Sequence, residues 1–144
     1  MKIIPVLLTL SFTVTAAAQV QRPAGPERAA KEMFFADAAC SMGPVIPWPG
    51  YSLLGGPVLI YRRNPPQAVL AGSTFAPAGF TPFTADGFAG RTAYYSTAPL
   101  DGLGSVFYTD YLLRGATVFA MPYDDDAGLA RAVRTAVHER FHVF

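Results

Sequence analysis

Cysteine, charge and histidine are all scarce in this chain of 144 residues. The single cysteine, Cys40, excludes an internal disulfide, and its neighbours Phe35–Ala39 do not form the context of a lipid-attachment site, so it is expected to be a buried or free thiol. Charged residues make up 15% of the chain, and 11 basic residues nearly balance 10 acidic ones. Without clustered excess positive charge, the chain is not expected to bind nucleic acid.

Apolar residues, glycine and proline are abundant instead. Apolar residues make up 51% of the sequence, which suffices for a hydrophobic core and argues against disorder. The length fits one domain rather than two. Thirteen glycines and thirteen prolines exceed average usage, so many turns and short elements are expected.

The first 18 residues predict export. They contain Lys2, an apolar run of about 12 residues and small residues up to Ala18, an order that indicates a secretory signal peptide cleaved before Gln19. The alternative is a membrane anchor, but a spanning helix needs roughly 20 apolar residues. Without Lys2 the mature chain carries ten basic and ten acidic residues. No later stretch is long and apolar enough to span a bilayer, so a periplasmic or secreted protein without membrane contact is expected.

Hydrophobic periodicity predicts an α+β fold with an N-terminal helix, a small twisted and mostly antiparallel sheet, and a C-terminal helix. Helix formers over Glu27–Met42 carry apolar residues at close to 3.6-residue spacing, and Gly43-Pro44 ends them. Short apolar or alternating runs predict strands, the first two joined as a hairpin across Asn64–Pro66. The expected strands are 57–61, 67–71, 91–97, 105–113 and 115–121.

Two segments are expected to be irregular. Prolines forbid regular structure over 46–51, where Trp48 and Tyr51 are expected to fill an edge of the core rather than to bind a partner. Residues 72–90 have no period and are interpreted as a loop packed by its phenylalanines. The Asp124–Asp126 triplet supplies N-cap chemistry, and a final helix is expected from residue 127 to the end of the chain.

This final helix contains an H-E-x-x-H pattern, which runs from His138 through Glu139 to His142. Residues four apart lie one turn above each other, so two imidazoles can converge on one zinc ion, and the glutamate can reach the zinc-bound water as general base. The chain has only two histidines and three glutamates, and shuffling it gives this pattern in roughly a few of ten thousand cases. His138 and His142 are therefore predicted to bind zinc, and Glu139 is the predicted catalytic base.

Helical rotation agrees with this prediction. At about 100° per residue, both histidines fall on one polar face, while Leu129, Val133 and Ala136 belong to an apolar arc on the other side. Arg140 interrupts that arc, and the sequence offers no reason for it. The alternative is a solvated helix surface on which the histidine pair is incidental.

A catalytic zinc site also needs a third protein ligand and an open position. The chain contains no other histidine, so the ligand would have to be a carboxylate or come from elsewhere. None of the carboxylates is favoured by its context: Glu27, Glu32, Asp37, Asp86, Asp101 and Asp110.

On the motif H-E-R-F-H the chain resembles the zincin metallopeptidases. The resemblance covers the final helix and the strand 115–121 before it, about 30 residues. It implies an active-site helix beneath a small twisted sheet, Zn²⁺ held by His138 and His142, Glu139 as general base, and a peptide or protein substrate added to the edge of the sheet. The fragment 138–144 is also similar to the motif of uncharacterised exported bacterial proteins, in which the chain continues after it.

In zincins the third ligand lies downstream of the motif, and here only two residues follow His142. The apolar, uncapped end at Val143-Phe144 also favours a truncated reading frame. Residues 19–144 are therefore interpreted as the N-terminal part of a zincin-like domain; the alternative is a complete small protein whose last helix docks into its own core.

The predicted function is hydrolysis of peptide bonds by an exported zinc metallopeptidase. The alternative belongs to a different class, an exported binding or structural module without catalysis, in which the metal site is incidental or serves stability. In that case the aromatic loops at 48–51 and 75–88 would form a partner surface.

Overall fold

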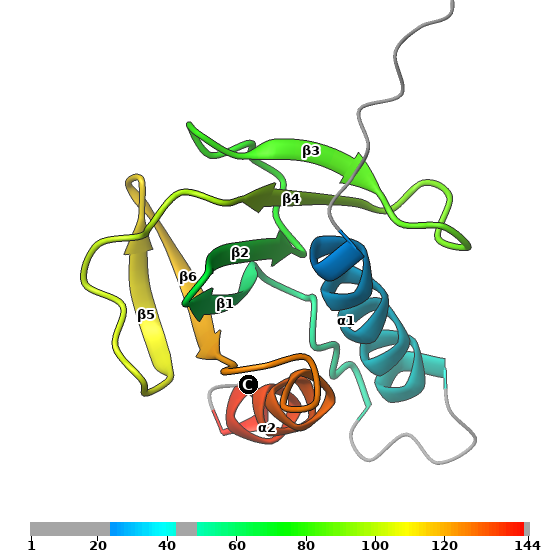
Figure 1. Cartoon of the computed structure of the whole chain (residues 1–144). Coiled ribbons are helices and arrows are strands. Elements are labelled where there is room, and N and C mark those ends of the chain that lie inside the picture. The colour runs from blue at the N-terminus through cyan, green and yellow to red at the C-terminus, as the bar shows by residue number, and fades with distance from the viewer. Residues whose placement is uncertain (1–23, 43–48, 143–144) are drawn as a thin grey trace, which may run out of the picture.

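The computed structural model describes residues 24–42 and 49–142 and contains two helices and six strands (Figure 1). The predicted signal peptide, Trp48 and the last two residues lie outside the described residues. No helix in the described ranges has the length and apolar character that crossing a membrane requires. In chain order the elements are α1 (Ala24–Met42), β1 (Val58–Arg63), β2 (Pro66–Ala71), β3 (Thr81–Thr84), β4 (Thr92–Ser96), β5 (Tyr108–Leu113), β6 (Ala116–Pro122) and α2 (Leu129–Phe141).

The strands form one mixed sheet in the order β3-β4-β2-β1-β6-β5. All neighbouring strands are antiparallel except β1 and β6, which are parallel. The predicted hairpin between β1 and β2 is confirmed, with Val58 opposite Ala71 and Arg63 opposite Pro66. These two central strands are covered on both faces, which explains why their sequences are almost continuously apolar rather than alternating.

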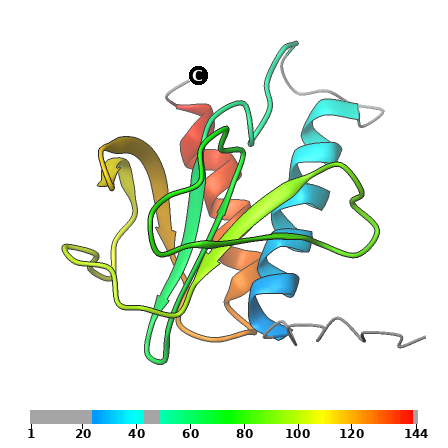
Figure 2. The ribbon, with the colours of Figure 1, turned by 90° about the horizontal axis from the view of Figure 1, so that it is seen from above.

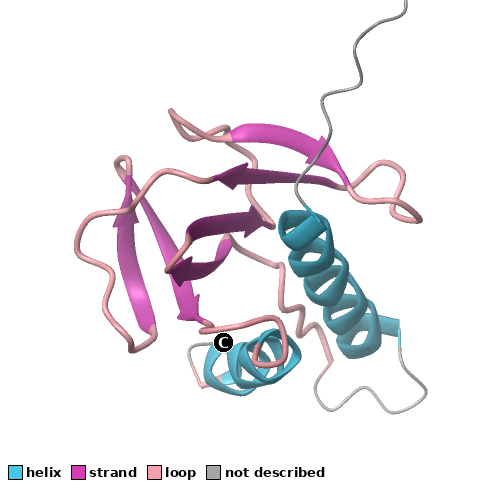
Figure 3. Ribbon diagram, in the orientation of Figure 1, coloured by secondary structure: helices cyan, strands magenta, loops and turns pink. Residues whose placement is uncertain are grey.

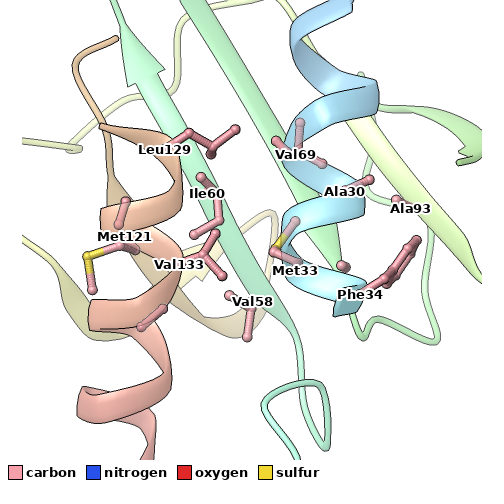
Figure 4. Close-up of a cluster of buried hydrophobic side chains, with 14 of the residues drawn as sticks. Ala30, Met33, Phe34, Val58, Ile60, Val69, Ala93, Met121, Leu129 and Val133 are labelled. Atoms are coloured by element: carbon pink, nitrogen blue, oxygen red, sulfur yellow. The ribbon is translucent and has the colours of Figure 1, made fainter. Parts of the chain in front are cut away.

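Both helices cover the same face of the sheet (Figure 3). Figure 4 shows Met33 of α1 and Val133 of α2 on either side of Val58 and Ile60 of β1, while Phe34 of α1 lies toward Ala93 of β4; all belong to one buried cluster. The apolar arc predicted for the last helix is confirmed, because its buried residues are Leu129, Ala132, Val133 and Ala136.

Loops rather than helices cover the opposite face. The alternate residues of the central strands, including Leu59, Tyr61 and Leu70, form a second buried cluster there. Partly buried side chains from the loops pack against it, among them Phe75, Phe80, Leu100 and Leu103.

The two helices run side by side in the same direction, so their C-terminal ends lie at the same end of the molecule (Figure 2). The β1 strand begins at this end and runs away from it toward the hairpin turn. The C-terminal turn of α2, which carries the H-E-x-x-H pattern, therefore lies beside the segment that leads into β1.

Two local predictions differ from the structure. β3 forms within 72–90, which was expected to be a loop; it is a four-residue edge strand with Pro82 inside it and only Phe83 buried, so it has no periodicity to detect. α2 begins at Leu129, and its N-cap is Gly128 without a side-chain cap. Asp125 instead accepts a hydrogen bond from the Gly128 N–H at 2.7 Å, just outside the helix.

Candidate metal centre

The two histidines of the motif lie together on the exposed side of α2. His138 is in the last helical turn and His142 is the residue that caps it. Their Nε2 atoms are 3.2 Å apart, and the rings meet edge to face with centroids 4.8 Å apart. Two nitrogen ligands at about 2.05 Å from a tetrahedral zinc ion would be about 3.3 Å apart. The same separation suits a hydrogen bond between two neutral imidazoles.

No third ligand joins the pair in the part of the chain that the structure describes. Within residues 24–42 and 49–142, no three or more histidine, cysteine, aspartate or glutamate side chains are arranged to hold a metal ion. Among the carboxylates considered from the sequence, Asp37 already accepts hydrogen bonds from Ser52, Leu54 and Arg91. Glu27 is bound to the Asp86 N–H and to Lys31.

A loop of residues 49–57, here called the anchor loop, holds the motif end of α2. The Tyr51 hydroxyl donates a hydrogen bond of 2.7 Å to the carbonyl of Val137, the residue before the first histidine. The rings of Tyr51 and Phe141 meet edge to face with their centroids 6.0 Å apart, and only 4% of Tyr51 is exposed. Burial raises the pKa of Tyr51 to about 12, so the hydroxyl remains protonated and keeps donating. The expectation that Tyr51 fills an edge of the core is confirmed.

The anchor loop also explains Arg140. The guanidinium of Arg140 lies directly over Gly56, and a methyl group at Gly56 would overlap it. A partly buried Arg140 therefore places its guanidinium against the anchor loop, which accounts for a charged residue at this position of the helix. This contact joins residues far apart in the chain, so helical periodicity alone could not indicate it.

Asp37 of α1 fastens the anchor loop from the other side. Its carboxylate accepts hydrogen bonds from the Ser52 hydroxyl at 2.6 Å, the Leu54 N–H at 2.9 Å and Arg91 at 2.6 Å. Burial by itself raises the pKa of Asp37, but these hydrogen bonds and the Arg91 charge outweigh it and hold the pKa below its ordinary value. The signal in the sequence is an isolated acidic residue on the apolar side of a helix, which needs a partner when it is buried.

Cys40 is a free, half-buried thiol, as expected. Burial and the nearby charge of Asp37 raise its pKa, so the thiol stays protonated at neutral pH. A protonated thiol is a poor nucleophile and a poor metal ligand.

No family model matches this chain, and neither a curated protein nor a solved structure matches it. The resemblance to zincins therefore depends on the motif residues and on their geometry.

Proposed function

We propose that this protein is an exported, zinc-dependent metallopeptidase that acts on peptides or proteins through His138, Glu139 and His142. The 3.2 Å separation of the two Nε2 atoms carries the proposal, because it lies close to the spacing of two ligands on one tetrahedral ion. The exposure of both rings and the attachment of the preceding carbonyl to Tyr51 support it further. In this proposal residues 1–18 direct export and are removed by cleavage between Ala18 and Gln19.

The residues have distinct roles in this proposal. His138 and His142 bind the metal through their Nε2 atoms, and zinc, when bound, supplies Lewis acidity for hydrolysis of a peptide bond. The Glu139 carboxylate accepts a proton from the attacking water and returns it to the leaving amine. A catalytic site also needs a third protein ligand, and no histidine, cysteine or carboxylate of the described residues joins the pair in such a group.

Zinc binding and hydrolysis are tested separately. For the 144-residue chain, isothermal titration is expected to give weak zinc binding, since two imidazoles leave the ion undercoordinated. Binding is expected to disappear in the double variant His138→Ala, His142→Ala and to persist in Arg134→Ala, an exposed substitution on the same helix. Unchanged zinc binding in the double variant would contradict the ligand assignment.

In protein purified from its native source, one zinc per molecule is expected. Glu139→Gln is expected to retain that zinc and to lose about 10²-fold or more in peptide hydrolysis, because the general base is removed. Glu32→Gln, which neutralises a carboxylate on α1, is the matched control and should keep both properties. Hydrolysis that is unchanged in Glu139→Gln would remove the catalytic role.

A non-catalytic exported module is the second candidate. The observation in its favour is that no third ligand accompanies the histidine pair among the described residues. In this case metal binding would raise the melting temperature, while no peptide would be hydrolysed and Glu139→Gln would have no effect.

A further inference from the structure

A pocket lies at the hairpin end of the sheet, at the opposite end of β1 from the motif. Its volume is about 190 Å³, somewhat larger than a cavity of about 150 Å³ that admits a benzene ring. Its walls are mainly apolar. They include Tyr61 and Ala68 from the central strands and Pro99, Leu100 and Leu103 from the loop between β4 and β5. Three residues of β1 lie between the anchor loop and Tyr61, the first β1 residue of the pocket, a span of about 13 Å.

Tyrosine hydroxyls hold the loop that forms one wall of this pocket. Tyr61 shares its hydroxyl proton between the carbonyls of Gly104 and Val106, at 2.9 and 2.8 Å. Tyr108 accepts a hydrogen bond from the Gly104 N–H at 2.8 Å, and Tyr111 donates to the Asp101 carbonyl at 2.7 Å. Burial raises the pKa of Tyr61, so its proton remains available for this role at neutral pH. The pocket is therefore shaped before any ligand enters.

Two arginines lie at the pocket and differ in their partners. Arg62 is occupied by the Pro65 carbonyl, the Gln67 side chain and Asp126. Arg63 is exposed, and no ion pair of the described residues involves it. Asp124 lines the adjoining hollow with Arg63 but forms no ion pair with it within the described residues. An apolar pocket of this size with one such unpaired guanidinium matches a ligand with a small apolar body and a single carboxylate.

We propose that this pocket binds a small monocarboxylate with an aromatic or branched body, and that Arg63 binds its carboxylate. The apolar body lies against Leu100 and Leu103. The site does not depend on the histidine motif or on zinc.

Benzoate is the probe, and amide shifts in two-dimensional NMR spectra are the measurement. Saturable shifts are expected for Ala68, Leu100 and Leu103, with a dissociation constant of roughly millimolar order. Arg63→Gln should weaken benzoate binding about fivefold, because it removes a partly screened ion pair. Arg28→Gln, which removes an exposed arginine on α1, should leave it unchanged.

Benzyl alcohol separates the charge from the shape of the probe. Benzyl alcohol should bind the unmodified protein more weakly than benzoate does. Its affinity for Arg63→Gln should equal its affinity for the unmodified protein. Absence of saturable shifts at the pocket amides would overturn the site, and equal affinity of benzoate for the unmodified protein and Arg63→Gln would overturn the role assigned to the arginine.

Discussion

Gly72 shows how closely the anchor loop fits against the sheet. It follows β2 with a φ of +70°, a left-handed conformation that costs a residue with a side chain about 1–2 kcal/mol. A Cβ atom at this position would lie 2.5 Å from the Gly56 carbonyl oxygen and 3.0 Å from that of Leu54. Both obstacles are backbone atoms, so they cannot rotate away as a side chain would.

Gly72→Ala is therefore expected to lower the free energy of unfolding by about 3 kcal/mol, the sum of backbone strain and overpacking. Gly87→Ala is the matched control, because Gly87 has a φ of +83° but nothing within 4 Å of its added Cβ. It should cost only about 1 kcal/mol. Urea unfolding monitored by circular dichroism measures the free energy of unfolding of both variants. Equal decreases for the two variants would show that the close approach to the loop carbonyls does not contribute to the cost.

Arg140 and Gly56 illustrate what residue patterns can and cannot reveal. Helical rotation correctly predicted the buried side of α2 and the exposed histidines, because both follow from neighbours within one helix. It left Arg140 unexplained, since its partner is a glycine more than eighty residues earlier. The same limit applies to the third zinc ligand, which no local pattern selects.

At the scale of elements, Asp37 connects α1 to the anchor loop, and Tyr51 connects that loop to α2. The Ser52 hydroxyl and the Leu54 N–H both donate hydrogen bonds to the Asp37 carboxylate. The anchor loop is therefore held by the ionised form of Asp37. Its pKa is lower in the folded protein than its ordinary value of 3.8, and Arg91 contributes to that shift. An aspartate with a depressed pKa stabilises the fold above its unfolded-state pKa, and this contribution is lost as the pH falls toward the folded-state value.

Asp37→Asn is expected to lower the free energy of unfolding by about 2–3 kcal/mol at pH 7, because charged hydrogen bonds are replaced by neutral ones. The difference from the unmodified protein should shrink as the pH falls below about 4, where the aspartate becomes protonated in the unfolded chain. Asp110→Asn changes an exposed aspartate on β5 and should show no comparable difference. Urea unfolding at several pH values measures this, and a difference that stays constant down to pH 2 would contradict the assignment.

The elements themselves were predictable to different degrees. Both helices, the hairpin and the strands with apolar or alternating runs were expected within a few residues of their observed bounds. β3 was missed because Pro82 and the two exposed threonines of the strand leave no pattern, and pairing with β4 alone defines the strand. The parallel pairing of β1 and β6 also depends on contacts between distant segments, which a local pattern does not encode.

At the scale of the whole molecule, the open sheet has two edges that differ in protection. β3 is short and contains Pro82, which cannot donate a hydrogen bond to an added strand. β5 is the less protected edge. Its pairing with β6 has a register shift between Tyr108 and Tyr111, but the exposed side chains on and before the strand include large apolar ones. Of the four exposed large apolar side chains in the described part of the chain, three lie on β5 or directly before it: Val106, Phe107 and Leu112.

Leu112→Lys is expected to reduce aggregation on heating, because it breaks an apolar edge with a charge. Leu112 is 65% exposed, so the free energy of unfolding should change by less than about 0.5 kcal/mol. Thr109→Lys adds the same charge to an exposed position of the same strand while leaving Leu112 in place. Static light scattering during a thermal ramp should show a higher onset temperature for Leu112→Lys than for Thr109→Lys; equal onset temperatures would assign the effect to net charge rather than to the apolar edge.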